Sequence, residues 1–209
     1  MVYETRYPDH PWLNQNAIAL LAEWLHSEHR GLEFGSGRST MWIAKRVKHL
    51  TSVESNPQWH SHVTEQLAAS GTNNVDYHFF SDEDSYVGIA NRFNSDELDF
   101  VIVDGAFDRA RCALEAVKKI RPGGMLVIDN SSWFIPSTSR SPLSRSTSQG
   151  PASELWGQVL DYVKNWKSVW TENGIPYKDT AFYFRQPNEV SCGFVSVDRV
   201  GDMSSHGCS

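Results

Sequence analysis

A glycine-containing turn constrains the fold of this chain more than any other feature. It lies within Leu32–Thr40, which reads Leu-Glu-Phe-Gly-Ser-Gly-Arg-Ser-Thr. The apolar residues before the turn predict a strand, and residues 40–48 after it have helical spacing, with Ser39 and Thr40 as candidate caps. Glycine can adopt positive φ and lets a ligand approach the backbone N–H groups at the start of a helix. The stretch therefore predicts a strand, a ligand-binding turn and a helix.

Strand and helix patterns alternate along most of the chain. Residues 3–12, which contain Pro8 and Pro11, predict an irregular arm before the first helix. The alternation favours an α/β fold with a mostly parallel sheet and helices on both faces, and ligands bind such sheets beyond the carboxyl ends of the strands. The predicted helices are 14–27, 40–47, 58–69, 86–93, 109–120 and 152–166, and the predicted strands are 31–34, 50–54, 75–80, 98–103, 125–128, 168–170 and 181–185.

Composition limits the classes of partner. The chain has 209 residues, of which 40% are hydrophobic, so it can bury the core of one domain. A net charge of −6 argues against a nucleic-acid partner. The three cysteines, Cys112, Cys192 and Cys208, form no Cys-x-x-Cys pair and predict a reducing compartment. No apolar run reaches the roughly 20 residues of a membrane span, and no signal peptide is apparent, so we expect a cytoplasmic protein without a membrane span.

The segment 131–151 departs from the alternating pattern. It contains eight serines and two threonines, a composition that cannot bury enough apolar surface to fold alone. Two interpretations are open: a disordered surface loop, or a mobile lid over a site, because the segment directly follows a strand end. The pattern also fades after Pro187. We therefore expect one domain over residues 1–187 and a partly disordered C-terminal extension over 188–209.

An acidic residue at the end of the second predicted strand complements the glycine turn. A Gly-x-Gly turn followed by an acid at the next strand end is typical of nucleoside binding, in which the carboxylate accepts the ribose hydroxyl protons. Glu54 occupies that position. Dinucleotide-binding fingerprints have a third glycine where this chain has Thr40. On this pattern alone, two alternative functions stay open: a dehydrogenase that uses NAD, and a non-catalytic nucleoside-binding module.

Four motifs in order resemble those of the class I S-adenosylmethionine-dependent methyltransferases over roughly residues 12–185. They are Leu32–Gly37, Glu54, Asp104-Gly105, and Arg121-Pro-Gly-Gly124 followed by Asp129-Asn130. The resemblance implies a seven-stranded sheet whose last two strands form a reversed hairpin, and S-adenosylmethionine as the cofactor. It assigns cofactor contacts to Glu33, Gly35, Ser36, Gly37, Ser39 and Thr40 at the methionine end, to Glu54 at the ribose, to Ser81 and Asp82 near adenine, and to Asp104.

A narrower resemblance is to metal-dependent O-methyltransferases of the catechol and macrolide-sugar types. In these enzymes an Asp after the fourth strand and an Asp-Asn or Asp-Asp pair after the fifth bind one divalent cation. The corresponding residues are Asp104, Asp129 and Asn130, and three such oxygen ligands suit Mg²⁺, Mn²⁺ or Ca²⁺. A cation bound there would lower the pKa of an acceptor hydroxyl and orient it. In the alternative interpretation, Asp104 only contacts the cofactor and Asp129-Asn130 cap the turn after the strand.

The resemblance does not supply the catalytic base. The catechol type has a Lys three residues after the first metal ligand and the sugar type an Asp two residues after it, where this chain has Phe107 and Ala106. Asp108 is the nearest carboxylate and is equally suited to cap the following helix. His10 and His60 are further candidates, because imidazole titrates near neutral pH.

Tryptophans are numerous, and some adjoin the expected cleft. The chain has eight, of which Trp12 and Trp133 are the expected acceptor contacts. The small methyltransferases associated with surface polysaccharides resemble this chain in the turn motif and the Asp-Asn-Ser after Pro-Gly-Gly. The resemblance implies O-methylation of a sugar hydroxyl on a glycan or a glycosylated metabolite, with a phenolic or catechol acceptor as the alternative. The oligomeric state is not indicated.

Overall fold

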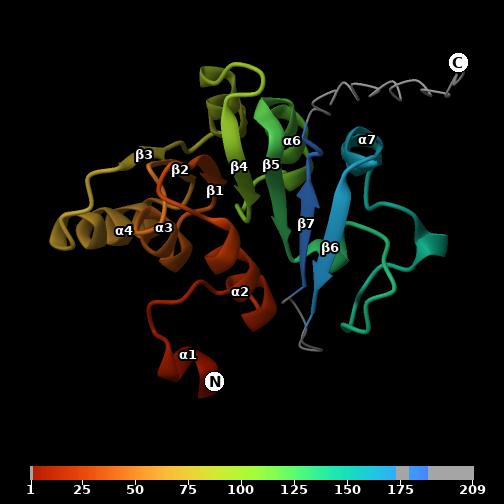
Figure 1. Ribbon diagram of the computed structural model, residues 1–209, viewed down its shortest axis with the longest axis horizontal. Coiled ribbons are helices and arrows are strands. Elements are labelled where there is room, and N and C mark those ends of the chain that lie inside the picture. The colour runs from red at the N-terminus through yellow and green to blue at the C-terminus, as the bar shows by residue number, and fades with distance from the viewer. Residues whose placement is uncertain (1, 173–178, 188–209) are drawn as a thin grey trace, which may run out of the picture.

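A seven-stranded sheet forms the centre of the molecule (Figure 1). The computed structural model describes residues 2–172 and 179–187. The strand order is β3-β2-β1-β4-β5-β7-β6, and β7 runs antiparallel to both β5 and β6. This confirms the predicted fold, including the reversed C-terminal hairpin. The strands are β1 Arg30–Phe34, β2 His49–Glu54, β3 Val75–Phe79, β4 Leu98–Val103, β5 Ile120–Asp129, β6 Lys167–Thr171 and β7 Thr180–Phe184.

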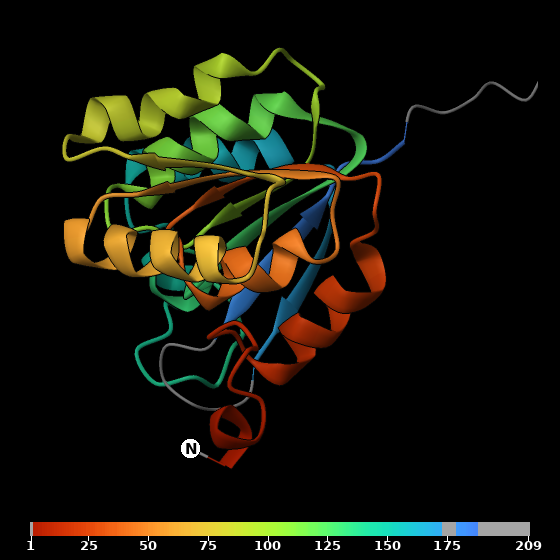
Figure 2. The ribbon, with the colours of Figure 1, turned by 90° about the vertical axis from the view of Figure 1, so that its left-hand side faces the viewer.

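Helices cover both faces of the sheet, as Figure 2 shows. Side chains of β4 alternate between two cores: Val101 and Val103 pack with α5, α6 and α7, while Phe100 and Ile102 pack with α2 and α3. A strand buried on both faces requires this continuous apolar sequence. The helices are α1 Val2–Arg6, α2 Gln15–Trp24, α3 Arg38–Ala44, α4 Pro57–Ala69, α5 Glu83–Gly88, α6 Arg109–Ala116 and α7 Glu154–Val163, with short 3₁₀ turns at Ile89–Arg92, Val117–Lys119, Ser131–Trp133 and Thr147–Gln149.

Two predictions of secondary structure were wrong in part. Residues 2–6 form the short helix α1, so the irregular arm begins only at Tyr7. Strand β5 begins at Ile120, five residues earlier than predicted, and runs through the Pro-Gly-Gly segment. This is possible because the pairing with β4 is irregular between Leu98 and Phe100, and because the Gly123 N–H donates to the Arg185 carbonyl.

The serine-rich segment 131–151 packs beside the C-terminal hairpin. Its backbone pairs with itself, for example through Ser137 N–H to the Arg145 carbonyl. The hydroxyls of Ser139 and Ser141 donate to the buried carboxylate of Asp179, just before β7. Its mobility stays a prediction. The connection at 173–176 and the extension 188–209 lie outside the described residues.

The helices of the described residues are all too short or too polar to cross a membrane.

Candidate active site

The predicted site motifs converge at one edge of the sheet. Strands β2, β1, β4 and β5 are neighbours and run parallel, so their carboxyl ends lie side by side. In Figure 1, β4 and β5 point toward the side where the N-terminal arm and segment 131–151 lie. The turn after β1, Glu54 at the end of β2, Asp104 after β4 and Asp129 at the end of β5 therefore meet there.

The two glycines of the turn have different roles. Gly35 has φ +91°, and a Cβ atom at this position would lie 2.7 Å from the Gly105 backbone, so both conformation and space require glycine. Gly37 has φ 165°, which is extended backbone, and a Cβ there would come no closer than 3.6 Å to Trp59. The expectation of positive φ thus holds for Gly35 only.

The cap of α3 also differs from the prediction. Gly37 is the N-cap, and Thr40, three residues later, accepts a hydrogen bond from the Gly37 N–H with its hydroxyl (2.9 Å). Thr40 therefore caps the helix from inside, while Ser39 has no capping role. The same Thr40 hydroxyl donates to Glu33 Oε2 (2.6 Å), which couples the turn to β1.

Glu33 is a buried acid beneath the turn. Its Oε2 atom accepts from Thr40 and from the Ser52 hydroxyl (2.6 Å), whereas Oε1 makes no hydrogen bond of standard geometry. Burial raises the pKa of Glu33 to about 7, although the nearby hydroxyls of Ser39, Ser52 and Thr40 oppose part of that effect. Glu33 is thus a fully buried acid whose protonated form is favoured up to about neutral pH.

Glu54 holds the turn in place. Its Oε2 accepts from the N–H (3.1 Å) and the hydroxyl (3.0 Å) of Ser36, and its Oε1 accepts from the N–H groups of Ser55 and Asn56 (both 2.8 Å). A carboxylate offers about four acceptor positions. A ribose diol would therefore have to replace one of these donors, with the Ser36 hydroxyl as the side chain that can rotate away.

A small cavity, here called the turn cavity, lies between the arm and the turn. It has a volume of about 30 Å³, room for about two water molecules. Arg38, at the start of α3, has one terminal guanidinium nitrogen buried without a hydrogen-bond partner. The lining residues are Pro11, Trp12, Leu13, Leu21, Ser36, Gly37, Arg38, Ser39, Ile43, Ile102 and Asp104.

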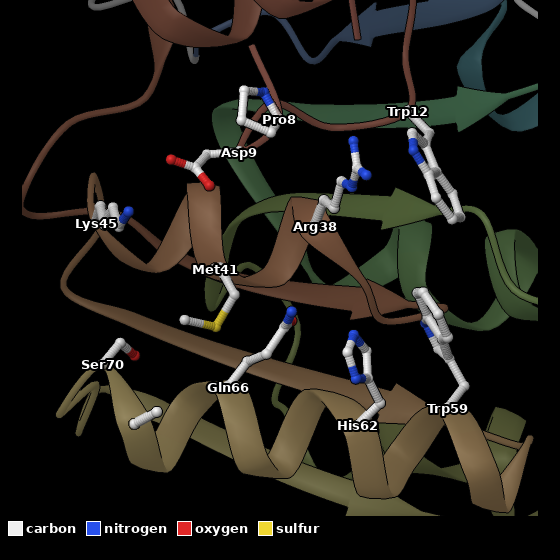
Figure 3. Close-up of a pocket in the computed structure, with 11 residues that line it drawn as sticks. Pro8, Asp9, Trp12, Arg38, Met41, Lys45, Trp59, His62, Gln66 and Ser70 are labelled. Atoms are coloured by element: carbon white, nitrogen blue, oxygen red, sulfur yellow. The ribbon is translucent and has the colours of Figure 1, made fainter. Parts of the chain in front are cut away.

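A larger cleft, here called the arm groove, adjoins the turn cavity through Trp12 and Arg38, which line both (Figure 3). Its volume is about 550 Å³. The arm forms one wall, α4 forms the other, and α3 lies between them. The lining residues are Pro8, Asp9, Trp12, Arg38, Met41, Lys45, Trp59, His62, Gln66, Ala69 and Ser70.

Arg109 lies where the sequence predicted a divalent cation. Its five N–H groups make five hydrogen bonds, to the carbonyl (3.0 Å) and Oδ1 (3.0 Å) of Asp104, the Gly105 carbonyl (2.8 Å), the Asp129 carbonyl (2.8 Å) and Asn130 Oδ1 (3.0 Å). The guanidinium thus bridges the ends of β4 and β5 and uses all of its donors.

Asp129 does not fit the role of a metal ligand. It is buried, its Oδ1 accepts from the Thr180 hydroxyl (2.8 Å), and its Oδ2 accepts from the Asn130 side-chain amide (2.8 Å). Burial, followed by the nearby Asp104 charge, raises the pKa of Asp129 to about 8, which favours the neutral acid. Within residues 2–172 and 179–187, no group of three His, Cys, Asp or Glu side chains could hold a metal ion. The predicted set of Asp104, Asp129 and Asn130 therefore does not fit a divalent cation while Arg109 is in place.

Comparison with known proteins identifies the domain. Residues 32–131 match the sequence model of a family described as "Methyltransferase domain". Residues 32–131 are thus similar to a methyltransferase domain. This match favours methyl transfer over the dehydrogenase and over the non-catalytic module. No curated protein matches the chain.

Solved structures share the fold of this methyltransferase. The O-methyltransferase TomG of Streptomyces achromogenes, involved in tomaymycin synthesis and solved with SAM, has a TM-score of 0.60 and 20% identity over 87% of this chain and 85% of that one. A candidate caffeoyl-CoA O-methyltransferase of Staphylococcus aureus has a TM-score of 0.58 and 16% identity over 86% and 88%. An rRNA methylase of Streptococcus thermophilus has a TM-score of 0.52 and 16% identity over 81% and 93%. At these identities the likeness concerns the fold alone.

The residues around the methyltransferase turn fit the methionine end of S-adenosylmethionine. That end carries an ammonium and a carboxylate group. Glu33 Oε1 and a terminal nitrogen of Arg38 are buried polar atoms without a hydrogen-bond partner of standard geometry in the described structure. Arg38 lines the turn cavity, where its guanidinium would pair with the carboxylate, whereas Glu33 is fully buried and contacts the hydroxyls of Thr40 and Ser52.

The other predicted site residues are dispersed. Asp108 caps α6 by accepting from Ala110 N–H (2.9 Å), and it lines a separate cavity that also contains Trp133. His10 contacts the Tyr3 hydroxyl (2.8 Å), and His60 stacks on Tyr77. Neither histidine lines the turn cavity or the arm groove. Ser81 and Asp82 are exposed beyond the end of β3, where Asp82 caps α5.

Sequence reasoning missed three residues at the site. Arg38 directly follows Gly37 and Arg109 follows the Asp-Gly of β4, so position alone could have drawn attention to both. Trp59 lies in the first turn of α4 and donates from Nε1 to the Ser36 carbonyl (2.7 Å). Nothing in its sequence context distinguishes it from a core tryptophan.

Proposed function

We propose that this methyltransferase transfers a methyl group from S-adenosylmethionine to a hydroxyl group of a saccharide acceptor. The observation that carries the proposal is the position of Asp104, the one carboxylate that lines the turn cavity among the described residues. It lies beside the turn whose Arg38 would pair with the carboxylate at the methionine end of the donor. Two of the solved structures above are described as O-methyltransferases, which supports oxygen as the acceptor atom.

The proposed mechanism uses alignment and a base. When bound, S-adenosylmethionine supplies a methyl group on a positively charged sulfur. An acceptor hydroxyl aligned with that methyl group would form the new O–C bond as the S–C bond breaks and the sulfur leaves. The carboxylate of Asp104 takes the hydroxyl proton. Arg109 donates to Asp104 Oδ1 and holds the carboxylate in a fixed orientation.

We propose that this reaction needs no divalent cation. The support is the guanidinium of Arg109, which already contacts oxygens of all three predicted ligand residues. Its fixed positive charge at the ends of β4 and β5 orients the same groups that a cation would orient. Arg109 has no further N–H group to offer an acceptor, so it acts as a positioning residue.

One observation favours a phenolic acceptor as the second candidate. A cavity of about 350 Å³ on the far side of Arg109 is walled by aromatic side chains. Phe134 stacks on Trp156 with ring centroids 5.2 Å apart, and the arginine lies over the Phe134 ring at 5.8 Å. Its lining residues are Gly105, Ala106, Phe107, Asp108, Arg109, Trp133, Phe134 and Trp156. An aromatic acceptor would use this cavity, with Asp108 as its base.

Isosteric substitution of the two carboxylates tests the proposal. We expect Asp104→Asn to lower methyl transfer to oligosaccharides by about 100-fold, because a general base contributes at least that factor. The affinity for S-adenosylhomocysteine, measured by calorimetry, should stay within about threefold of wild type, and EDTA should not change the rate.

The matched variant Asp108→Asn separates the two candidates. It should leave saccharide methylation unchanged if Asp104 is the base. Loss of methyl transfer to catechol in Asp108→Asn, with Asp104→Asn fully active, would contradict the saccharide proposal. An EDTA-sensitive wild-type enzyme that Mg²⁺ restores would contradict the proposal that no cation is needed.

A further inference from the structure

We propose that the arm groove binds an acidic saccharide, which is the part of the acceptor that adjoins the methylated hydroxyl. The inference rests on the proposed function for its statement that the saccharide is an acceptor. The binding site itself is inferred from the groove and can be tested without turnover.

The volume of the groove and the two indole rings that line it suit a saccharide site. Its volume of about 550 Å³ falls within the range of about 300–1,000 Å³ that ligand sites span. Trp12 and Trp59 form one end, with ring centroids 5.7 Å apart and planes at 26°. Trp12 is 52% exposed, which is unusual for so large an apolar side chain. The hydrogen bond from Trp59 to Ser36 fixes this end beside the turn.

The charge of the groove favours an anion. Arg38 and Lys45 face one carboxylate, Asp9, so the permanent charges sum to an excess of one positive charge in a chain whose net charge is −6. Among the described residues, neither Arg38 nor Lys45 forms an ion pair. Arg38 lies over the Trp12 ring at 5.2 Å, with one nitrogen buried and unpaired. The buried nitrogen is the one assigned to the methionine carboxylate, and the half-buried guanidinium keeps further N–H donors for a carboxylate or phosphate in the groove.

The polar side chains of the groove favour hydroxyl-rich ligands over flat aromatic ones. Asp9, His62, Gln66 and Ser70 can donate to or accept from hydroxyl groups along both walls. Figure 3 shows them spread along the length of the cleft, with indoles at one end only. A sugar presents C–H groups to an indole and hydroxyls at its edges, which matches this distribution.

The groove also leads to the reaction centre. Trp12 and Arg38 line both the arm groove and the turn cavity, and Asp104 lines the turn cavity. A saccharide held in the groove would lie next to the turn cavity, which the proposed base lines. The groove therefore gives the acceptor an approach from the arm side, and it shares no lining residue with the aromatic cavity that contains Trp133.

The experiment measures binding of two defined tetrasaccharides to the full chain saturated with S-adenosylhomocysteine. The acidic probe is a tetrasaccharide of alternating hexuronate and N-acetylhexosamine, and the neutral probe is the N-acetylglucosamine tetramer. Calorimetry should show at least tenfold tighter binding of the acidic probe. Trp12→Ala and Lys45→Gln should each weaken it at least fivefold, whereas Lys164→Gln, an exposed lysine at the end of α7, should not.

Each outcome decides the proposal. Equal affinity for both probes would overturn the acidic specificity, and unchanged affinity in Trp12→Ala and Lys45→Gln would overturn the site. Arg38→Gln tests which anion Arg38 binds, the methionine carboxylate of S-adenosylhomocysteine or the acidic group of the saccharide. Weaker binding of S-adenosylhomocysteine with unchanged saccharide affinity would overturn the role of Arg38 in the groove. Groove binding without methyl transfer would contradict only the proposed function.

Discussion

At the residue scale, the site depends on a few side chains whose surroundings are unusual. Gly35 lies against the Gly105 backbone, so the turn after β1 and the turn after β4 pack with no side chain between them. Glu33 lies beneath this contact as a buried carboxyl group with one oxygen unpaired. Residue type alone predicts neither property. Gly37 is a glycine like Gly35, and Glu54 is a glutamate like Glu33, but their environments differ.

Alanine at the two glycines should destabilise the protein to very different extents. Gly35→Ala adds a Cβ 2.7 Å from backbone atoms at φ +91°, so we expect a loss of more than about 3 kcal/mol in the free energy of unfolding. Gly37→Ala adds a Cβ with no contact under 3.6 Å at an extended φ, and it should change that free energy by less than about 1 kcal/mol. Urea denaturation measures both. Equal destabilisation by the two variants would contradict the different roles assigned here.

Glu33 should make the protein less stable as pH rises. Its folded pKa, about 7, lies above the unfolded value near 4.3, so the native state binds more protons between these values. The stability associated with protonated Glu33 is complete below about pH 4 and is lost as pH rises through 7. Glu33→Gln should flatten the fall in melting temperature between pH 5 and 8. Glu65→Gln, an exposed control on α4, should keep the wild-type slope, and parallel curves for all three proteins would refute the shifted pKa.

At the element scale, the strand ends explain both what the sequence could predict and what it could not. Apolar runs and glycine turns located the sheet, its reversed hairpin and the shared edge of Glu54, Asp104 and Asp129. The same residue types suggested a metal site, because two acids and an amide at adjacent strand ends resemble a ligand set. The direction of the Arg109 side chain depends on tertiary packing of α6 against β4 and β5. The spacing of residues in the sequence cannot predict that direction.

Removal of the Arg109 side chain should create the cation site that the sequence suggested. Arg109→Ala leaves five oxygens of Asp104, Gly105, Asp129 and Asn130 around one space, and loss of the ion pair with partly exposed Asp104 should cost about 1 kcal/mol of stability. Hard oxygen donors of this kind suit Ca²⁺ or Mg²⁺. We expect millimolar Ca²⁺ to raise the melting temperature of Arg109→Ala and not that of wild type or of Arg92→Ala, an exposed-arginine control. A Ca²⁺ response of equal size in wild type would mean that the guanidinium does not exclude the cation.

At the scale of the whole molecule, two segments outside the sheet enclose its carboxyl edge. The arm lies over the turn on one side, and segment 131–151 lies beside β6 and β7 on the other. Composition predicted neither position, because serine-rich sequence has no periodicity from which to infer a partner. Two acids hold the second segment: buried Asp179 accepts from the hydroxyls of Ser139 and Ser141, and Glu172 accepts from the Ser139 hydroxyl and the Arg140 N–H.

Loss of Asp179 should release the segment while the sheet stays folded. Asp179→Ala removes the acceptor of two serine hydroxyls, and Arg140 and Arg145 within the segment are trypsin sites. We expect trypsin to cleave after these arginines at least tenfold faster than in wild type, because cleavage follows the population of the open segment. Mass spectrometry would locate the cuts, and S-adenosylhomocysteine affinity should be unchanged, since the turn lies at other strands. Asp161→Ala, an exposed aspartate on α7, is the control. Cleavage at the wild-type rate would show that the backbone pairs within 131–151 and the contacts with Glu172 suffice to hold the segment, and that Asp179 is not its anchor.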